Sequence, residues 1–391
     1  MAARRGPARA GVALIVLAAV LASCTGTGQV ATSPSAPPPS PSPAPTAGGP
    51  AGTDAPPSPA AATPAPPAPP TAVPDSGTWA RLEVDGPAPD PREDHTWTVD
   101  GEGRIAWLFG GRDGDTSFAD LWAFDLGAGS WRRVDVTGDA PAARFGHEAA
   151  WAPGRGLVVF GGQRGSTFFD DLWLFEPGAD GASGSWRLLP PGGGAPVARY
   201  GSCSGIGPDG RLWISHGFTS DGVRFADTLA YDFDAGAWSD QAPPTERPVE
   251  RCLHACWWTS DGQLALYGGQ TTGVPALGDL WLFTPGNGGP PTNAWVELGS
   301  QAPGARHLPA VARYGAATFL FGGRGSDREA LGETWLAVDG TAGFEPFAAT
   351  GDEPPARSGA TLVLDPAGDR LLLFGGLGRN ARNDLWALTF P

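Results

Sequence analysis

Beyond about residue 75, apolar residues gather in short runs of five to seven, and glycine- and proline-rich turns separate the runs. Runs of this length that are rich in Val, Phe, Trp and Leu predict β-strands, because they are too short for helices. Leu157-Val158-Val159-Phe160 is apolar on both faces, which is typical of a strand whose sheet lies between two other sheets. The pattern therefore predicts an all-β fold.

The strand pattern repeats six times. Each unit begins with Pro-x-x-Arg, and the arginines are 51 to 55 residues apart: Arg92, Arg144, Arg199, Arg251, Arg306 and Arg357. A glycine pair ends the second apolar run of each unit: Gly110-Gly111, Gly161-Gly162, Gly268-Gly269, Gly322-Gly323 and Gly375-Gly376, with His216-Gly217 as the departure. An acidic residue 27 or 28 positions after each arginine opens the third run: Asp120, Asp171, Asp227, Asp279, Glu333 and Asp384. A self-similar unit of this length predicts a radial array of small sheets.

The ends of the array complete each other. The last unit stops at Pro391 after its third strand, and an unpaired strand with the sequence of a fourth one lies at Thr78-Trp79-Ala80-Arg81-Leu82. We expect this strand to complete the last blade beside Leu385-Trp386-Ala387-Leu388 and so to close the ring.

The glycine pair, the acidic residue with its aromatic neighbour and the later Trp resemble kelch repeats. The resemblance covers about Trp79 to Pro391, and it implies a six-bladed kelch-type β-propeller over residues 76–391, related to the kelch part of galactose oxidase. In that family the first strand of each blade is the innermost one. Kelch propellers mostly bind partners through the loops at one end.

The first 75 residues have another composition. Arg4, Arg5 and Arg9 precede an apolar run from Gly11 to Ala22, which is too short to span a bilayer but fits a signal peptide. The run ends in Leu21-Ala22-Ser23-Cys24, which resembles the lipobox of bacterial lipoproteins; the resemblance implies a signal peptide over 1–23 and lipidation at Cys24. Residues 24–75 are Pro, Ala, Ser, Thr and Gly with almost no core-forming side chains, so we expect a disordered tether. The protein is thus expected to be exported and lipid-anchored to the outer face of the cytoplasmic membrane.

Charge narrows the class of partner. The chain carries 26 basic residues, all Arg, and 41 acidic ones, for a net charge of −15. This balance argues against nucleic acid and anionic membrane surfaces as partners. No apolar stretch of about 20 residues is present to form a membrane-spanning helix. We expect membrane contact only through the lipid anchor, and a monomer.

The six repeat arginines and the six acids should lie at one end of the channel. Two interpretations are open: each arginine pairs with an acid, or some arginines stay free and bind an anionic ligand, since guanidinium forks grip carboxylates. Loops between the second and third strands of the blades add further candidates for binding at this mouth: Arg112, Arg164, Arg324 and Arg379. Polar loop residues of this kind are common binding residues.

Histidine and tryptophan mark the innermost strands. His95, His147, His254 and His307 fall at the starts of these strands, where we expect packing and no metal site. Trp257-Trp258 breaks the register, so the two rings face opposite ways and one is a candidate to line the channel.

Cysteine use fits an exported protein. Cys203 and Cys256 occupy similar heights on neighbouring innermost strands with opposite facing, which makes them a candidate disulfide. Cys252 is too far along the same strand from Cys256 to bridge it. The alternative is three free, buried thiols.

Three functions are compatible with these residues. The first is a surface-tethered module that binds a protein or a carbohydrate, with no cofactor and no catalytic residues. The second is a carbohydrate-active enzyme resembling the exported sialic acid mutarotases, which needs only a general acid and base at the channel mouth. The third is a copper radical oxidase resembling galactose oxidase, for which Tyr231 and Tyr267 are poorly placed because both occupy repeat-locked strand positions.

Overall fold

The computed structural model describes residues 72–391, apart from residue 180 and the segments 244–245, 287–292 and 300–302. All regular secondary structure in the described part of the chain is β-strand. The signal peptide, Cys24 and most of the predicted tether lie outside the described residues.

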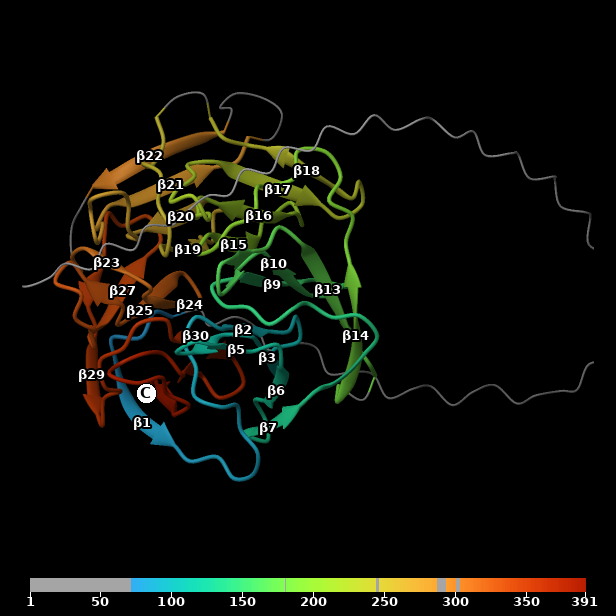
Figure 1. Cartoon of the computed structure of the whole chain (residues 1–391). Helices are drawn as coiled ribbons and strands as arrows, with labels where there is room; N and C mark the ends of the chain where they lie inside the picture. Colours follow the sequence, from blue (N-terminus) through green and yellow to red (C-terminus); the bar gives the residue numbers. More distant parts are fainter. Residues whose placement is uncertain (1–71, 180, 244–245, 287–292, 300–302) are drawn as a thin grey trace, which may run out of the picture. The chain divides into compact units, whose positions relative to one another are not determined.

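Six sheets form the blades of a propeller (Figure 1). Blade 1 contains β2 (Thr96–Val99), β3 (Ile105–Phe109), β6 (Leu121–Asp125) and β7 (Ser130–Arg133). Blade 2 contains β9 (Glu148–Ala152), β10 (Gly156–Phe160), β13 (Leu172–Pro177), β14 (Ser183–Leu188) and β8 (Asp135–Thr137). Blade 3 contains β15 (Cys203–Ile206), β16 (Leu212–Ser215), β17 (Thr228–Asp232) and β18 (Ala237–Asp240).

The second half of the ring repeats this architecture. Blade 4 contains β19 (Ala255–Trp258), β20 (Leu264–Tyr267), β21 (Leu280–Thr284) and β22 (Ala294–Gly299). Blade 5 contains β24 (Ala310–Tyr314), β25 (Ala317–Phe321), β27 (Thr334–Val338) and β28 (Glu345–Pro346). Blade 6 contains β30 (Thr361–Asp365), β31 (Arg370–Phe374), β32 (Leu385–Thr389), β1 (Ser76–Leu82) and β29 (Ala348–Gly351).

The first strand of each blade lies innermost. The strands β2, β9, β15, β19, β24 and β30 contact one another in that cyclic order around a central channel, and Figure 1 shows them nearest the centre. Three two-stranded ribbons lie in the loops: β4–β5 (Arg112–Asp113, Thr116–Ser117), β11–β12 (Gln163–Arg164, Thr167–Phe168) and β23–β26 (Arg306–His307, Arg324–Gly325).

The core lies between the blades. Along β10, Leu157 and Val159 pack toward blade 1, and Val158 and Phe160 pack toward blade 3. Successive side chains of a strand point to opposite faces, so a strand that is apolar at every position fills both interblade layers. This explains why Leu157-Val158-Val159-Phe160 is apolar on both faces.

The predicted closure is confirmed. β1 pairs antiparallel with β32, with Thr78 opposite Thr389 and Leu82 opposite Leu385. Trp79 is 1% exposed, and its indole N–H donates a hydrogen bond to Thr334 Oγ1 of blade 5 at 3.0 Å. A strand from the start of the described chain thus completes the blade that holds the chain's last residues.

A backbone ring joins neighbouring blades at the glycine pairs. In each blade the N–H of the second residue of the pair donates to the carbonyl of the next blade's repeat arginine, and Gly376 returns to Arg92 to close the cycle. In blade 1 the second residue of the pair is Gly111, which has a positive φ of 96°. A Cβ added there would lie 2.7 Å from His95 Cβ. Only glycine fits both demands.

Candidate functional site

The six repeat arginines are the hubs of a buried network. In blade 1, Arg92 Nη1 and Nη2 donate to the two carboxylate oxygens of Asp120 at 2.8 and 2.9 Å, and Nη1 also donates to the Gly110 carbonyl. The guanidinium lies 4.2 Å from the centre of the Phe118 ring. The Trp122 indole N–H donates to the same carboxylate at 2.7 Å. This bidentate, charge-assisted geometry is the strong form of the Arg–carboxylate contact.

The network recurs around the ring, with its weakest form in blade 5. Five arginines bind their aspartates through both oxygens, and the arginine side chains are at most 2% exposed. In blade 5, Arg306 Nη1 lies 3.4 Å from Glu333 Oε2, and Glu333 is 53% exposed. Of the two interpretations of these arginines, the paired one describes the structure. Their guanidinium N–H groups are bonded to acids and backbone carbonyls and so are not available to a ligand.

Backbone hydrogen bonds encircle the channel at the same end. The second residue after each repeat arginine donates its N–H to the matching carbonyl of the preceding blade over 2.7 to 3.1 Å, which closes a six-membered ring. We call these residues the mouth ring: Asp94, Gly146, Gly201, Leu253, Leu308 and Gly359. All six have positive φ, from 52° to 63°. Their N–H groups are used within the ring, so ligand binding at this mouth falls to side chains.

Arg112 is held at the mouth by two acids. It contacts Glu93 Oε1 and Asp94 Oδ2, each at 3.2 Å, and its guanidinium lies 4.3 Å from the Phe145 ring centre. Burial and the neighbouring Asp94 carboxyl together raise the pKa of Glu93 to about 7, because Arg112 and Arg324 only partly oppose the rise. A carboxyl with this pKa exchanges protons near neutrality.

Two of the predicted loop arginines meet in a hollow between blades 5 and 6. Arg324 and Arg379 line it together with two arginines that the sequence did not single out, Arg328 and Arg382. The hollow has a volume of about 680 Å³, and its one acidic lining residue is Glu329. Among the described residues, none of the four arginines has an ion-pair partner, and the buried Nε atoms of Arg324 and Arg382 have no hydrogen-bond acceptor. We call this feature the basic hollow.

The basic hollow opens at the same end as the mouth ring. Arg324 lies on β26, which pairs with β23 and so with the repeat arginine Arg306. The Arg382 carbonyl accepts a hydrogen bond from the N–H of Arg92. Arg164, the remaining loop candidate, is exposed on β11 in blade 2, away from the hollow.

The channel itself is a cavity of about 240 Å³, lined by the inner strands of all six blades. It continues into a space of about 190 Å³ beside the mouth ring. Neither Trp257 nor Trp258 is among the described residues that line it: Trp257 packs on Phe344 and Trp258 on Trp213, between blades. The alternating faces of an inner strand point at the neighbouring blades, which explains why both rings are taken up in interblade layers.

The four predicted histidines are buried where the inner strands begin, with exposed fractions of 3 to 8%. Burial lowers the pKa of His95 and of His254 to about 3 and that of His307 to about 4. Among the described residues, no three His, Cys, Asp or Glu are grouped so that they could hold a metal ion. The hydroxyls of Tyr231 and Tyr267 donate to the backbone carbonyls of Pro190 and Gly304.

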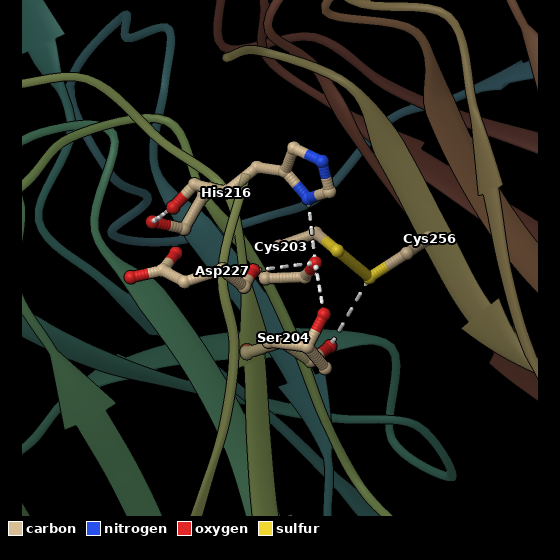
Figure 2. Close-up of a disulfide and its surroundings, with 8 residues drawn as sticks. Cys203, Ser204, His216, Asp227 and Cys256 are labelled. Atoms are coloured by element: carbon tan, nitrogen blue, oxygen red, sulfur yellow. Dashed lines mark hydrogen bonds between the residues drawn. A yellow bond between two sulfur atoms is a disulfide. The ribbon is translucent and has the colours of Figure 1, made fainter. Parts of the chain in front are cut away.

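A disulfide joins Cys203 of β15 to Cys256 of β19, with the two Cα atoms 5.8 Å apart (Figure 2). The bond links blades 3 and 4 and forms part of the channel wall. Cys252 is a free, buried thiol. Of the two arrangements left open by the sequence, the structure has the bridged one.

These features define a six-bladed kelch β-propeller, and comparison with known families agrees. Residues 72–269, just over half of the chain, match the family model of the KLHDC2/KLHL20/DRC7 Kelch-repeats domain. The chain therefore belongs to the kelch-repeat family, whose propellers are general protein-interaction modules. In the described part of the chain, no helix is present that could cross a membrane.

Similar curated proteins differ in their overall organisation. The chain is 24% identical to an F-box/kelch-repeat protein of Arabidopsis thaliana over 74% of this chain and 66% of that protein. It is 33% identical to the serine/threonine-protein phosphatase BSL2 of Arabidopsis thaliana over 46% of this chain and 18% of the phosphatase. It is 27% identical to the N-(sulfonatooxy)prop-2-enimidothioate sulfolyase of Thlaspi arvense over 63% of this chain and 74% of that enzyme. The chain thus spans less than two thirds of the first two relatives.

Proposed function

We propose that this chain is a cell-surface-tethered binding module that captures an acidic segment of a partner protein in the basic hollow. The observation that carries the proposal is the set of four arginines without ion-pair partners among the described residues: Arg324, Arg328, Arg379 and Arg382. Elsewhere at this end of the propeller, the repeat arginines are matched by acids, as Arg92 is by Asp120, and Arg112 is matched by Glu93.

Charge supports an anionic ligand. On a protein with a net charge of −15, a local excess of arginine concentrates the positive potential in one place. Guanidinium forks bind carboxylates, sulfates and phosphates through paired hydrogen bonds. The hollow therefore suits acidic side chains, a chain-terminal carboxylate or an acidic sugar.

Apolar side chains at the same end favour a protein over a free sugar. Val197, Val223, Val249 and Val274 are 41 to 57% exposed. Val197 and Val249 precede the inner strands of blades 3 and 4, and Val223 and Val274 lie in the loops between the second and third strands of those blades. A partner that places carboxylates in the hollow can cover these valines as well, since mixed apolar and polar contacts are typical of protein interfaces.

The test uses the full chain and a fluorescein-labelled hexaglutamate peptide, with binding followed by anisotropy. We expect the double variant Arg324→Glu/Arg379→Glu to weaken binding at least about tenfold, because hydrogen bonds to charged groups contribute about 1.5–3 kcal/mol. Arg133→Glu/Arg187→Glu is the matched control, because it changes the net charge by the same amount at exposed residues of the outer strands β7 and β14. Equal weakening by the control would mean that only the overall charge matters and would overturn the proposal.

The source of the negative charge can be separated with two further probes. A heparin-derived tetrasaccharide tests an acidic carbohydrate, and a neutral hexaglutamine peptide tests backbone contacts alone. Preference for the sugar over the peptide would replace the protein partner with a glycan, and binding of hexaglutamine as tight as that of hexaglutamate would remove the role of the arginines.

Residues 1–75 are the basis for proposing a membrane tether. We propose that Cys24 carries the lipid and that the propeller is displayed at the outer face of the membrane. The change Cys24→Ala should release the protein from the membrane fraction of the expressing cell into the soluble fraction. Unchanged membrane association would contradict the anchor while leaving the propeller's binding role intact.

A second candidate is an enzyme of the sialic acid mutarotase type. It is favoured by Glu93, whose pKa near 7 suits a general acid or base, beside the Arg112 guanidinium that a sugar carboxylate could engage. Anomerisation of N-acetylneuraminate, followed by NMR with the full chain, tests it. Acceleration that disappears in Glu93→Gln supports this activity, and an unaccelerated reaction removes it.

A further inference from the structure

Two histidines at the starts of inner strands, His95 and His147, make the same contact across an interblade boundary. In blade 2 the His147 ring, three residues after the repeat arginine, hydrogen-bonds through Nε2 to Thr96 Oγ1 of blade 1 at 2.8 Å. In blade 1 the His95 ring makes the same contact with Thr361 Oγ1 of blade 6 at 2.7 Å. The threonine is the fourth residue after the arginine of the preceding blade. The hydroxyl thus supplies a partner for Nε2 of each ring across two interblade boundaries, and the Nδ1 atoms of both rings have none among the described residues.

The pair is absent from the other four boundaries. At two of them the threonine position is Ala255 or Ala310 and the histidine position of the next blade is Pro309 or Ala360, so no polar group is left over. The remaining two boundaries lie between blades 2 and 4. At the threonine position, blade 2 has Glu148 and blade 3 has Cys203. The residue that should face Glu148 is Ser202, and its hydroxyl donates instead to the His216 carbonyl at 3.1 Å. The residue that should face Cys203 is His254, but Cys203 is bonded to Cys256.

The consequence is two polar groups without their repeat partners. His254 is 7% exposed, and neither ring nitrogen has a hydrogen-bond partner. Glu148 interacts with the hydroxyl of Ser204, and it has no ion-pair partner among the described residues. Both residues line the channel and the space beside the mouth ring.

The cavity around them has two kinds of wall. Blades 1 to 3 contribute the hydroxyls of Thr96, Thr98, Ser202 and Ser204. Blades 4 to 6 contribute mainly apolar side chains, and the one hydroxyl on this wall, that of Thr361, is hydrogen-bonded to His95. Glu148 is the one carboxyl among the described residues that line the 240 Å³ cavity, and no arginine lines it.

We propose that the channel binds the ammonium group of a small organic amine, held between the Glu148 carboxylate and the His254 ring. An ammonium group has three donors and no acceptor, which matches a carboxylate, a neutral imidazole nitrogen and a serine or threonine hydroxyl. The alkyl part would lie against the apolar wall of blades 4 to 6. This site is separate from the basic hollow and does not depend on the proposed function there.

Protonation of the lining residues fits a cationic ligand. Burial raises the pKa of Glu148 to about 8, and the Ser204 hydroxyl opposes the rise only in part. The other titratable groups that line this space from neighbouring inner strands are His95, His147 and His254, and burial lowers the pKa of each, so they stay neutral. At the mouth, Asp94 is matched by Arg112. The positive charge that would balance an ionised Glu148 must therefore come from a ligand.

The test is calorimetric titration of the full chain with n-butylamine at pH 7, with 1-butanol as the uncharged probe of similar size. We expect butylammonium to bind with release of roughly one proton, because the Glu148 carboxyl must ionise. Proton release is measured by repeating the titration in buffers with different ionisation enthalpies. Glu148→Gln should weaken binding at least about tenfold, and Glu297→Gln, an exposed acid on β22, should not change it.

Two further measurements keep the outcome decisive. The carbon NMR signal of the Glu148 carboxyl in the wild-type chain should titrate at lower pH when butylammonium is present, which tests the site without any substitution. Nα-acetyl-lysine amide distinguishes a lysine side chain of a partner from a free amine, and binding of either through Glu148 supports the site. Equal binding of butanol, equal binding by Glu148→Gln, or no binding of either amine would overturn the proposal.

Discussion

At the scale of single residues, the contribution of each arginine–acid pair to stability depends on how deeply the pair is buried. Arg144 is fully buried and binds both oxygens of Asp171, at 2.6 and 2.9 Å. Removing the acid leaves an uncompensated buried guanidinium, which is costly. The same substitution in blade 5 acts on a longer contact to a half-exposed Glu333.

We therefore expect Asp171→Asn to lower the free energy of unfolding by about 3 kcal/mol or more. Glu333→Gln should lower it by less than about 1 kcal/mol, because the contact is long, Glu333 is half-exposed, and Arg306 keeps its hydrogen bonds to backbone carbonyls. Denaturant unfolding followed by tryptophan fluorescence measures both. Losses of similar size in the two variants would contradict the role assigned to burial.

Acid titration separates two kinds of carboxyl. Burial alone would raise the pKa of Asp171, but the hydrogen bond and charge of Arg144 outweigh it and hold the pKa below its ordinary value. Such a group stabilises the fold above its unfolded pKa, and the contribution is lost as pH falls through the folded value. Glu148 has the opposite sign, because its folded pKa is raised to about 8. Its cost to folding grows as pH rises from about 4.5 to about 8.

The prediction for Glu148 concerns the difference in stability between the wild-type chain and the Glu148→Gln variant. As the pH rises from 5 to 8, the wild-type chain should lose stability relative to Glu148→Gln, whose amide does not titrate. Thermal unfolding of both proteins across this range gives the difference and cancels the histidines that they share. A difference that is independent of pH, or that grows in favour of the wild type, would show that the pKa of Glu148 is not raised in the folded protein.

The sequence predicts repeated residues far better than unrepeated ones. Constant spacing identified the repeat arginines and their acids, because every blade needs the same network. Arg328 and Arg382 lie outside any constant spacing and reach the basic hollow only through the fold of two loops. Glu148 stands at a repeat position that is Thr in two blades, Ala in two and Cys in one, so repeat spacing alone does not mark it.

At the scale of elements, the four long strands of a blade follow from their apolar pattern and the fifth does not. β8 and β29 are short and largely polar or small, and each pairs in parallel with the outer strand of the next blade. Their partners lie in another repeat unit, so no local pattern predicts them. They cover strand edges that would otherwise be open to another chain.

The disulfide acts between elements. Cys203 and Cys256 are 53 residues apart and join two inner strands that already pack side by side. The chain-entropy model gives roughly 4 kcal/mol for a loop of this length, and residual structure in the reduced, unfolded chain lowers this figure, so we expect reduction to cost about 2–4 kcal/mol. Denaturant unfolding with and without a reducing phosphine measures it.

The free thiol supplies the control for that measurement. Cys252→Ser leaves the disulfide in place and should retain the full response to reduction, whereas Cys203→Ser/Cys256→Ser should show none. If the double variant were as stable as the oxidised wild type, the bond would be a feature of the channel wall with no part in stability.

At the scale of the whole molecule, three cyclic features support one another. The glycine-pair hydrogen bonds and the mouth ring each run once around the propeller, and β1 closes the last blade against β32. A ring closed in this way has no terminal blade whose inner contacts are missing. Stability should therefore depend on the presence of β1 in its place more than on its position in the chain.

A circular permutant tests this dependence. Because Thr78 lies opposite Thr389 in an antiparallel pair, a turn of a few glycine-rich residues can join Pro391 to Ser76 as a hairpin. A chain that begins at residue 83 and ends with residues 76–82 after that turn should unfold cooperatively near the midpoint of the unpermuted chain. The same chain without residues 76–82 should lose at least the roughly 3–5 kcal/mol expected for removal of buried Trp79. A permutant as unstable as the truncated chain would mean that closure requires β1 to enter from the preceding segment.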